Sequence, residues 1–154
     1  MMLELFNVTI GQHIRDLSLT INDGELLCLS GQKEWGKTAL LRAILGFVPL
    51  DGGHISIDGE LLTAGSASYF RQFTAYVPQH LTLPEGYHGV PTDYVQLLDQ
   101  AVRSGKPLLI VDEPSRTLSA EEATQVDNLL RDAAQHGTTV LAVNSRILEN
   151  RVQL

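Results

Sequence analysis

The sequence predicts an α/β fold in which a mostly parallel sheet is flanked by helices and joined by a small antiparallel lobe. Three observations lead to this class. Residues 25–45 run from an apolar strand through a glycine loop into a helix-forming segment. Leu108–Val111 and Thr139–Val143 are short apolar runs of the length expected for buried parallel strands. Asp58-Gly59 is a hairpin signal, which indicates antiparallel pairing beside that sheet.

The first half of the chain alternates strands with turns. Apolar and polar residues alternate in the second of its opening strands, and Asn22-Asp23-Gly24 predicts a turn between the second and third. A helix follows, and Gly46 ends it. We expect strands at Leu3–Val8, Leu17–Ile21 and Glu25–Leu29, the helix at Lys37–Leu45, a loop at Pro49–Gly53, and hairpin strands at His54–Ile57 and Glu60–Leu62.

The second half alternates helices with buried strands. Pro78 ends one strand, and the prolines and glycines of residues 81–91 indicate a loop. Ser119 and Glu122 form a capping-box pattern before a long helix, which Gly137 ends. We expect strands at Thr74–Val77, Leu108–Val111 and Thr139–Val143, helices at Thr92–Ser104 and Ala120–Gln135, and an edge strand at Arg151–Leu154.

Composition narrows the classes of function. At 154 residues, with 44% apolar and 19% charged residues, the chain fits one folded domain. A net charge of −7 argues against nucleic acid as a partner. The single cysteine, Cys28, lies in an apolar run and is expected in the core. The apolar runs are too short to span a bilayer and no leader is apparent, so a cytoplasmic location is expected.

The glycine loop is the strongest motif in the sequence. It fits G-x-x-x-x-G-K-S/T between a strand and a helix, where backbone amides bind phosphate oxygens. Lys37 would reach the β and γ phosphates, and Thr38 would coordinate Mg²⁺. The alternative is a chance glycine-rich turn. The loop comprises Gly31, Gln32, Lys33, Glu34, Trp35, Gly36, Lys37 and Thr38.

Two carboxylates directly follow the buried run Leu108–Val111. Asp112 and Glu113 would be costly at the end of a buried strand unless a cation or a reacting group uses them. In a P-loop protein the aspartate helps to hold Mg²⁺, and the next glutamate can polarise the attacking water. Two solvated acids are the alternative, and the glycine loop disfavours it.

Residues 29–45, 49–59, 70–79 and 108–114 together resemble the ATP-binding subunits of ABC transporters. This resemblance covers most of the chain and implies a P-loop NTPase core that binds ATP and Mg²⁺. It also implies that Glu113 is the general base. Gln79 would sense Mg²⁺ and the γ-phosphate, and would mark where a transmembrane partner docks. A solvated loop glutamine is the alternative for Gln79.

The chain departs from this family in several places. Only residues 80–107 separate Gln79 from the buried run that precedes Asp112. Residues 1–154 are therefore expected to form one domain in which the family's helical subdomain, with its LSGGQ segment, is largely deleted. Glu34 stands where the family's loop has glycine. Ser119 stands where the family pattern has an aspartate, and Ser145 stands where it has the switch histidine. Ile10 occupies the place of the aromatic residue that stacks on adenine, with His13 as a weak substitute.

The expected function is therefore an ATP-binding subunit that energises or regulates a transmembrane transporter subunit, at the inner face of the membrane through that partner. ATP hydrolysis is left open, because LSGGQ would have to come from a second subunit, in a homodimer or in a heterodimer with a complete ABC ATPase. Two alternatives remain: a catalytically silent nucleotide-binding or interaction module derived from such an ATPase, and a self-contained P-loop phosphotransferase. The five histidines share no ligand spacing, which disfavours a zinc site.

Overall fold

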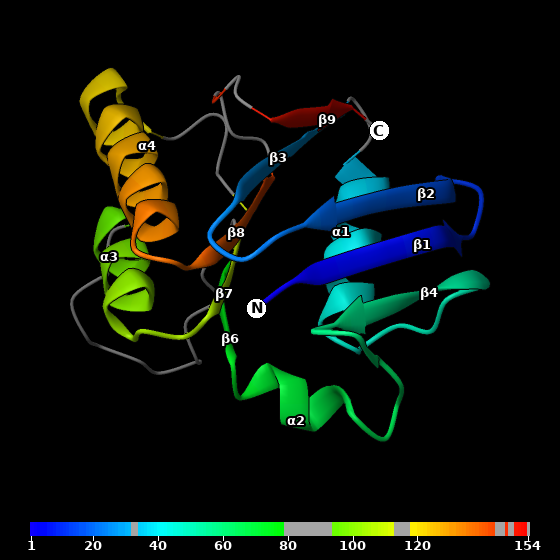
Figure 1. Cartoon of the computed structure of the whole chain (residues 1–154). Helices are drawn as coiled ribbons and strands as arrows, with labels where there is room; N and C mark the ends of the chain where they lie inside the picture. Colours follow the sequence, from blue (N-terminus) through cyan, green and yellow to red (C-terminus); the bar gives the residue numbers. More distant parts are fainter. Residues whose placement is uncertain (32–33, 79–93, 113–117, 144–146, 148–149, 154) are drawn as a thin grey trace, which may run out of the picture.

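The computed structural model describes residues 1–31, 34–78, 94–112, 118–143, 147 and 150–153, with the side chains of 34 and 35 excepted. Two sheets form the frame of the molecule (Figure 1). Sheet B is parallel in every pairing, and its strand order is β6-β7-β8-β3-β9. Its strands are β3 (Leu26–Ser30), β6 (Thr74–Val77), β7 (Leu108–Asp112), β8 (Thr139–Val143) and β9 (Arg151–Gln153).

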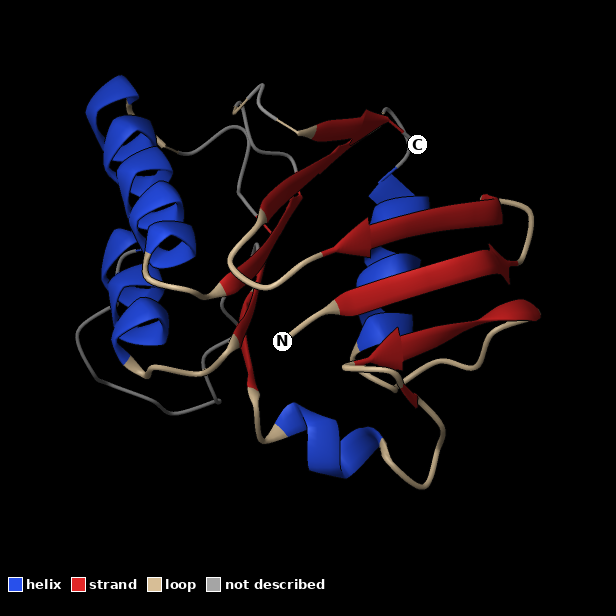
Figure 2. Cartoon of the chain, viewed as in Figure 1, coloured by secondary structure: helices blue, strands red, loops and turns tan. Residues whose placement is uncertain are grey.

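Sheet A is antiparallel, with the strand order β2-β1-β4-β5. Its strands are β1 (Leu3–Ile10), β2 (Ile14–Ile21), β4 (Gly52–Ile57) and β5 (Glu60–Leu61). The helices are α1 (Glu34–Ile44), α2 (Ala67–Arg71), α3 (Tyr94–Arg103) and α4 (Ala120–Gln135). Figure 2 shows α3 and α4 side by side on one side of sheet B, with α1 on the other side, behind sheet A.

The alternation of residues along the strands of sheet B creates two separate cores. On β7, Leu108 and Ile110 pack with α1 and sheet A. Leu109 and Val111, which point the opposite way, pack with α3 and α4. Because both faces of the sheet are covered at its centre, the central strands β3, β7 and β8 are mainly apolar and buried, as the runs in the sequence indicated.

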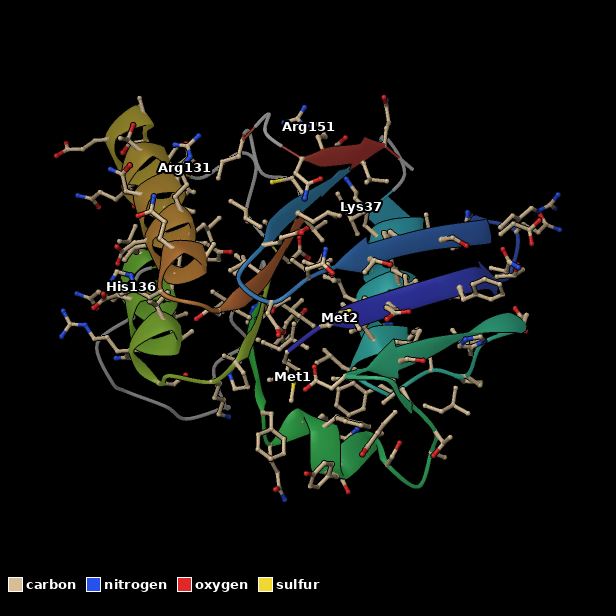
Figure 3. All side chains as sticks on the ribbon, viewed as in Figure 1. Met1, Met2, Lys37, Arg131, His136 and Arg151 are labelled. Carbon is tan, nitrogen blue, oxygen red and sulfur yellow. The ribbon has the colours of Figure 1, made fainter. Side chains whose placement is uncertain are left out.

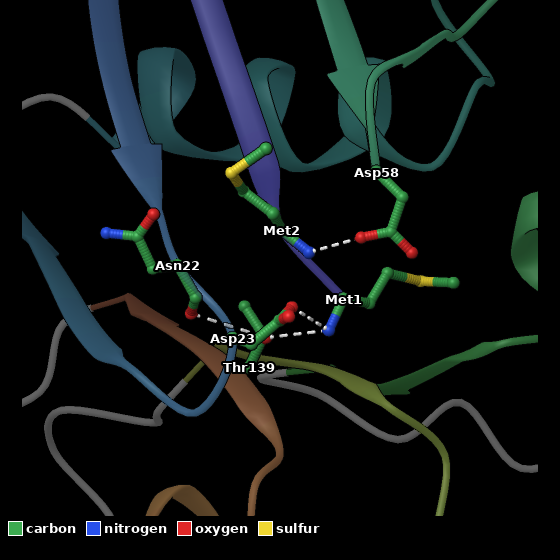
Figure 4. A network of polar contacts seen from close by, with 6 residues as sticks. All are labelled: Met1, Met2, Asn22, Asp23, Asp58 and Thr139. Atoms are coloured by element: carbon green, nitrogen blue, oxygen red, sulfur yellow. Dashed lines mark hydrogen bonds and ion pairs between the residues drawn. The ribbon is translucent and has the colours of Figure 1, made fainter.

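A polar network joins the two sheets at one corner (Figure 4). The α-amino group of Met1 forms an ion pair with Asp23 at 2.6 Å and a hydrogen bond with Thr139 Oγ1 at 3.2 Å. The Met2 amide donates to Asp58 Oδ1 at 2.7 Å. The start of β1 is thus tied to the β2–β3 turn, to β8 and to the β4–β5 hairpin.

The predicted fold class is confirmed, and so are most elements. The bounds of β6, β8 and α4 are those expected, and Cys28 is fully buried. Helix α2 was not predicted. The largest boundary differences are these: β2 begins at Ile14, α1 begins at Glu34, and β4 includes Gly52 and Gly53, which had been assigned to a loop. Several other ends, such as that of β1 at Ile10, differ by one or two residues. Leu154, at the end of the expected edge strand, lies outside the described residues, as do residues 92 and 93 before α3.

Within the described ranges, the helices lack the combination of length and apolar character that crossing a lipid bilayer requires.

Candidate phosphate-binding site

Lys37 is a buried cation in the first turn of α1. Its side chain is only 5% exposed, and its Nζ donates a hydrogen bond to the Gly31 carbonyl at 2.8 Å. Figure 3 shows Lys37 near the carboxyl end of β3. A positive charge is unfavourable at a helix N-terminus, where the helix dipole is already positive, and burial adds a desolvation cost. An anion bound at this end of α1 would remove both penalties.

Gly36 brings the start of α1 close to the β1–β2 turn. A Cβ at this position would lie 3.4 Å from Ile14 Cδ1 and 3.5 Å from His13 Cβ. These are ordinary van der Waals distances, so a methyl group would touch the turn without displacing it. Gly36 therefore packs directly against the β1–β2 turn.

The same contact places His13 at the candidate site. His13 is exposed in the β1–β2 turn and lies against Gly36. Ile10, in contrast, is only 8% exposed and belongs to the core shared by sheet A and α1. The side chain of Ile10 is therefore not available to a base, and His13 is the turn residue that the structure places beside the loop.

Asp112 lies at the carboxyl edge of sheet B, on the same edge as Gly31. It is the last residue of β7 and points to the same face as Ile110, toward α1. Asp112 pairs with Val143 of β8, and Val143 pairs with Leu29 of β3, so the three are level in the sheet. The spacing of two strands puts Asp112 roughly 10 Å from the end of β3. A phosphate group with its metal ion is of the size to bridge such a distance.

The charge of Asp112 also reaches Tyr76 on the neighbouring strand β6. Desolvation by burial raises the pKa of Tyr76, Asp112 raises it further, and Arg42 of α1 lowers it. Tyr76 pairs with Ile110, so it lies on the α1 face of sheet B with Asp112. The group of ionisable side chains at this edge therefore extends from α1 to β6.

The structure brings Gly31, Gly36, Lys37, Thr38 and Asp112 to one edge of sheet B. Thr38 is exposed in the first turn of α1, and Asp112 is half-buried. The other predicted site residues lie outside the described part: Gln32, Lys33, Gln79 and Glu113 entirely, and Glu34 and Trp35 in their side chains.

One functional candidate was missed at the sequence level. The hydroxyl of Tyr94, the first residue of α3, donates to the backbone carbonyl of Asp112 at 2.7 Å. No sequence pattern indicates this contact, since 18 residues separate its partners. Ser119 has a structural role: its hydroxyl accepts a bond from the Glu122 amide at 3.1 Å and completes the predicted capping box. Ser145 lies outside the described residues.

Two clefts formed by described residues lie away from Lys37 and Asp112. One runs between α3 and α4, past Val95 and Leu129. The other lies between the end of α1 and the β4–β5 hairpin, beside Phe47 and Leu61. Neither cleft contains Lys37 or Asp112, so the candidate site is identified from its side chains and not from a cleft.

Comparison with known proteins follows this geometry. A family model described as "ABC transporter" matches residues 14–143. The manganese transport system ATP-binding protein MntB of Bacillus subtilis is 36% identical over 98 residues, which cover 60% of this chain and 36% of that protein. The xylose import ATP-binding protein XylG of Shigella flexneri is 25% identical over 205 aligned positions, covering 96% of this chain and 39% of that protein.

A shorter match is closer in sequence. The spermidine/putrescine import ATP-binding protein PotA of Aggregatibacter actinomycetemcomitans is 48% identical over 50 residues, 32% of this chain and 13% of that protein. The chain thus spans well under half the length of these curated relatives.

Solved structures show the same fold. The structure of an ATP-binding subunit of an ABC transporter superposes with a TM-score of 0.81 at 18% identity, covering 100% of this chain and 86% of that one. A dimeric ATP-binding cassette in a post-hydrolysis state with ADP and Pi superposes with a TM-score of 0.76 at 17% identity, covering 99% and 94%. At these identities the likeness concerns the fold.

Proposed function

This chain belongs to the ABC transporter family, and from that membership we propose that it is an ATP-binding subunit that energises or regulates a transmembrane partner. The observation that carries the proposal is Lys37, a buried ammonium group at the N-terminus of α1, bonded to Gly31 on the same sheet edge as Asp112. A family match over residues 14–143 favours this function over an interaction module that does not bind nucleotide.

In the proposed complex, the backbone amides of residues 31–38 and the Lys37 ammonium hold the triphosphate of ATP. Lys37 neutralises charge on the β and γ phosphates, and the positive end of the α1 dipole adds to this. Thr38, Asp112 and Gln79 would hold Mg²⁺, which supplies charge neutralisation between the β and γ phosphates. Both Thr38 and Asp112 have the oxygen donors that Mg²⁺ prefers.

Hydrolysis, where it occurs, would use the same groups. Glu113 would accept a proton from the attacking water, and Lys37 with the loop amides would stabilise charge on the transferred phosphoryl group. Gln79 would orient the water. Because the sequence contains no LSGGQ segment, a second subunit would complete the phosphate cage, either in a homodimer or in a heterodimer with a complete ABC ATPase.

We further propose that residues 1–154 form one domain in which most of a helical subdomain is absent between 80 and 107. Helix α3 is the one helix described between β6 and β7, which supports this reduction. In this proposal the chain lies in the cytoplasm and is held at the inner face of the membrane by binding a transmembrane partner. Exposed apolar side chains are consistent with a protein partner. Phe47 is 64% and Leu61 is 52% exposed, beside the cleft between the end of α1 and the β4–β5 hairpin.

Denaturant unfolding with and without Mg²⁺-ATP tests nucleotide binding. A ligand that binds only the folded state stabilises it, by about 2.7 kcal/mol at a concentration one hundred times its Kd. We expect a clear gain in the free energy of unfolding for the wild-type chain. At the same ATP concentration Lys37→Ala should gain at most about half as much, since its affinity is at least about tenfold lower. An equal gain in both proteins would place ATP somewhere other than the glycine loop.

Phosphate release, measured alone and with a complete ABC ATPase, separates the hydrolysing subunit from a silent module. We expect Mg²⁺-dependent release that Glu113→Gln abolishes while ATP binding remains. Binding without release under either condition would leave a nucleotide-binding regulator as the function. Release that persists in Glu113→Gln would show that another group is the base.

A further inference from the structure

Tyr94 connects helix α3 directly to the end of β7. Its hydroxyl donates to the Asp112 carbonyl at 2.7 Å, a short and partly buried hydrogen bond. The acceptor belongs to the peptide group that joins Asp112 to Glu113. The contact therefore holds the main chain at the point where the two acidic residues of the second motif meet.

Asp112 lies where the pairing with β6 has ended. The pairing between β6 and β7 ends at Val77 and Val111, one residue before Asp112. On the other side, Asp112 still pairs with Val143 of β8. The residue is thus held by the ladder along one edge, and the Tyr94 hydroxyl adds a support that comes from outside the sheet.

Helix α3, which carries Tyr94, is held in place by its packing against the core. Leu98, one turn after Tyr94, is fully buried against β6, β7 and α4, and Tyr94 itself packs against the same core. A phenol fixed at its ring and bonded at its hydroxyl has little freedom to move, so it restrains the carbonyl position closely. Asp112 points to the opposite side, toward α1, and its orientation follows from that of its backbone.

We propose that Tyr94 is a positioning residue that sets the orientation of Asp112 and thereby the Mg²⁺-dependent part of ATP affinity. This inference rests on the proposed function. The triphosphate contacts of Lys37 and the loop amides do not pass through β7, so affinity without Mg²⁺ is independent of Tyr94. A purely structural role for Tyr94 would instead weaken ATP binding equally with and without the metal ion.

Trp35 makes the test direct. It is the only tryptophan in the sequence and belongs to the glycine loop, so its fluorescence reports ATP at that loop. ATP is titrated in Mg²⁺ and in EDTA, and the ratio of the two Kd values is compared between proteins. For Tyr94→Phe we expect an unchanged Kd in EDTA and a Mg²⁺-dependent gain smaller by about three- to tenfold, the net effect of one hydrogen bond.

Tyr69→Phe is the matched control. Tyr69 lies on α2, which precedes β6 and therefore lies at the opposite end of sheet B from Asp112. The same loss of a hydroxyl there should leave the Mg²⁺-dependent gain at its wild-type value. Replacing Tyr94 by 4-aminophenylalanine keeps an N–H donor at the same place and should restore most of the gain, even if Tyr94→Phe lowers stability.

The outcomes separate the two proposals. If the wild-type chain binds ATP and Tyr94→Phe keeps the full Mg²⁺-dependent gain, the positioning role is wrong and the proposed function stands. Equal losses in Mg²⁺ and in EDTA, or failure of 4-aminophenylalanine to restore the gain, also overturn it. If the wild-type chain binds ATP in neither buffer, the proposed function fails and this inference fails with it.

Discussion

Gly46 is the residue at which the end of α1 meets α2. Its φ of +83° is in the left-handed region, and a Cβ there would lie 2.3 Å from the Ala67 Cβ. Arg71 of α2 strengthens the junction by donating to the Leu45 carbonyl at 2.8 Å and by lying 4.7 Å above the Phe47 ring. Glycine is therefore required both for its backbone angle and for its lack of a side chain.

Gly46→Ala should lower the free energy of unfolding by about 3 kcal/mol, since a left-handed backbone and a steric clash act together. Gly105→Ala is the matched control: its φ of +71° imposes similar strain, but nothing lies within 4 Å of the added Cβ. It should cost only about 1 kcal/mol. Denaturant unfolding measures both, and equal losses would show that the junction with α2 accommodates the methyl group.

Tyr76 is expected to make the stability of the fold depend on pH in the alkaline range. Burial, followed by the charge of Asp112, raises its pKa above the ordinary 10.0. The folded state therefore holds this proton more tightly than the unfolded state. The resulting stabilisation is complete below pH 10 and is lost as the pH rises through the raised pKa.

Tyr76→Phe should remove that loss. Relative to the wild type, the variant should gain stability as the pH rises above 10, in denaturant unfolding followed at several alkaline pH values. Around pH 8, well below the pKa of Tyr76 in either state, the difference in stability between the two proteins should stay constant as the pH is varied. Parallel curves across the alkaline range would show that Tyr76 does not titrate differently in the folded state.

At the scale of elements, α4 depends on its N-terminal cap. Ser119 Oγ accepts from the Glu122 amide at 3.1 Å, and Glu122 Oε1 accepts from the Ser119 amide at 3.2 Å. We expect Ser119→Ala to cost about 1 kcal/mol in the free energy of unfolding, since the Glu122 amide loses its acceptor. Glu122→Gln keeps an acceptor at the same position and should cost much less. Equal losses in the two variants would contradict the capping role.

The strands of sheet A show why some boundaries could not be predicted. Asn7 and Asp16 have positive φ angles of 47° and 49°, and the β1–β2 register shifts twice between Leu5 and Ile10. Such irregularities break the alternation of apolar and polar residues. The predicted strands therefore ended at Val8 and began at Leu17, although the pairing reaches the turn at residues 11–13.

Helix α2 was missed for a different reason. It has five residues, too few to display a helical repeat, and it has no side-chain cap. Its position depends on contacts with Gly46 and Leu45, which lie more than twenty positions earlier in the chain. In contrast, α4 carries its cap, its apolar face and its terminating Gly137 within one segment, and the sequence predicts its bounds correctly.

At the scale of the whole molecule, sheet B separates two cores and presents its carboxyl edge to the site. The motif residues could be predicted because each lies within a short segment with its own signal: the glycine loop for Lys37, and the buried run for Asp112. That the two share an edge follows from parallel strand order, which the alternation of helices and strands indicated. The Tyr94 contact could not be predicted, because it exists only once α3 has packed on β7.

The same arrangement makes one claim central: the start of α1 is an anion site whose cation is Lys37. Isothermal titration of ATP with Mg²⁺ into the wild-type chain and into Lys37→Ala tests it most directly. We predict a wild-type Kd well below 1 mM and a loss of at least about tenfold in the variant, the effect of about 1.4 kcal/mol. No measurable heat of binding with the wild-type chain, or equal affinity in the two proteins, would contradict the account.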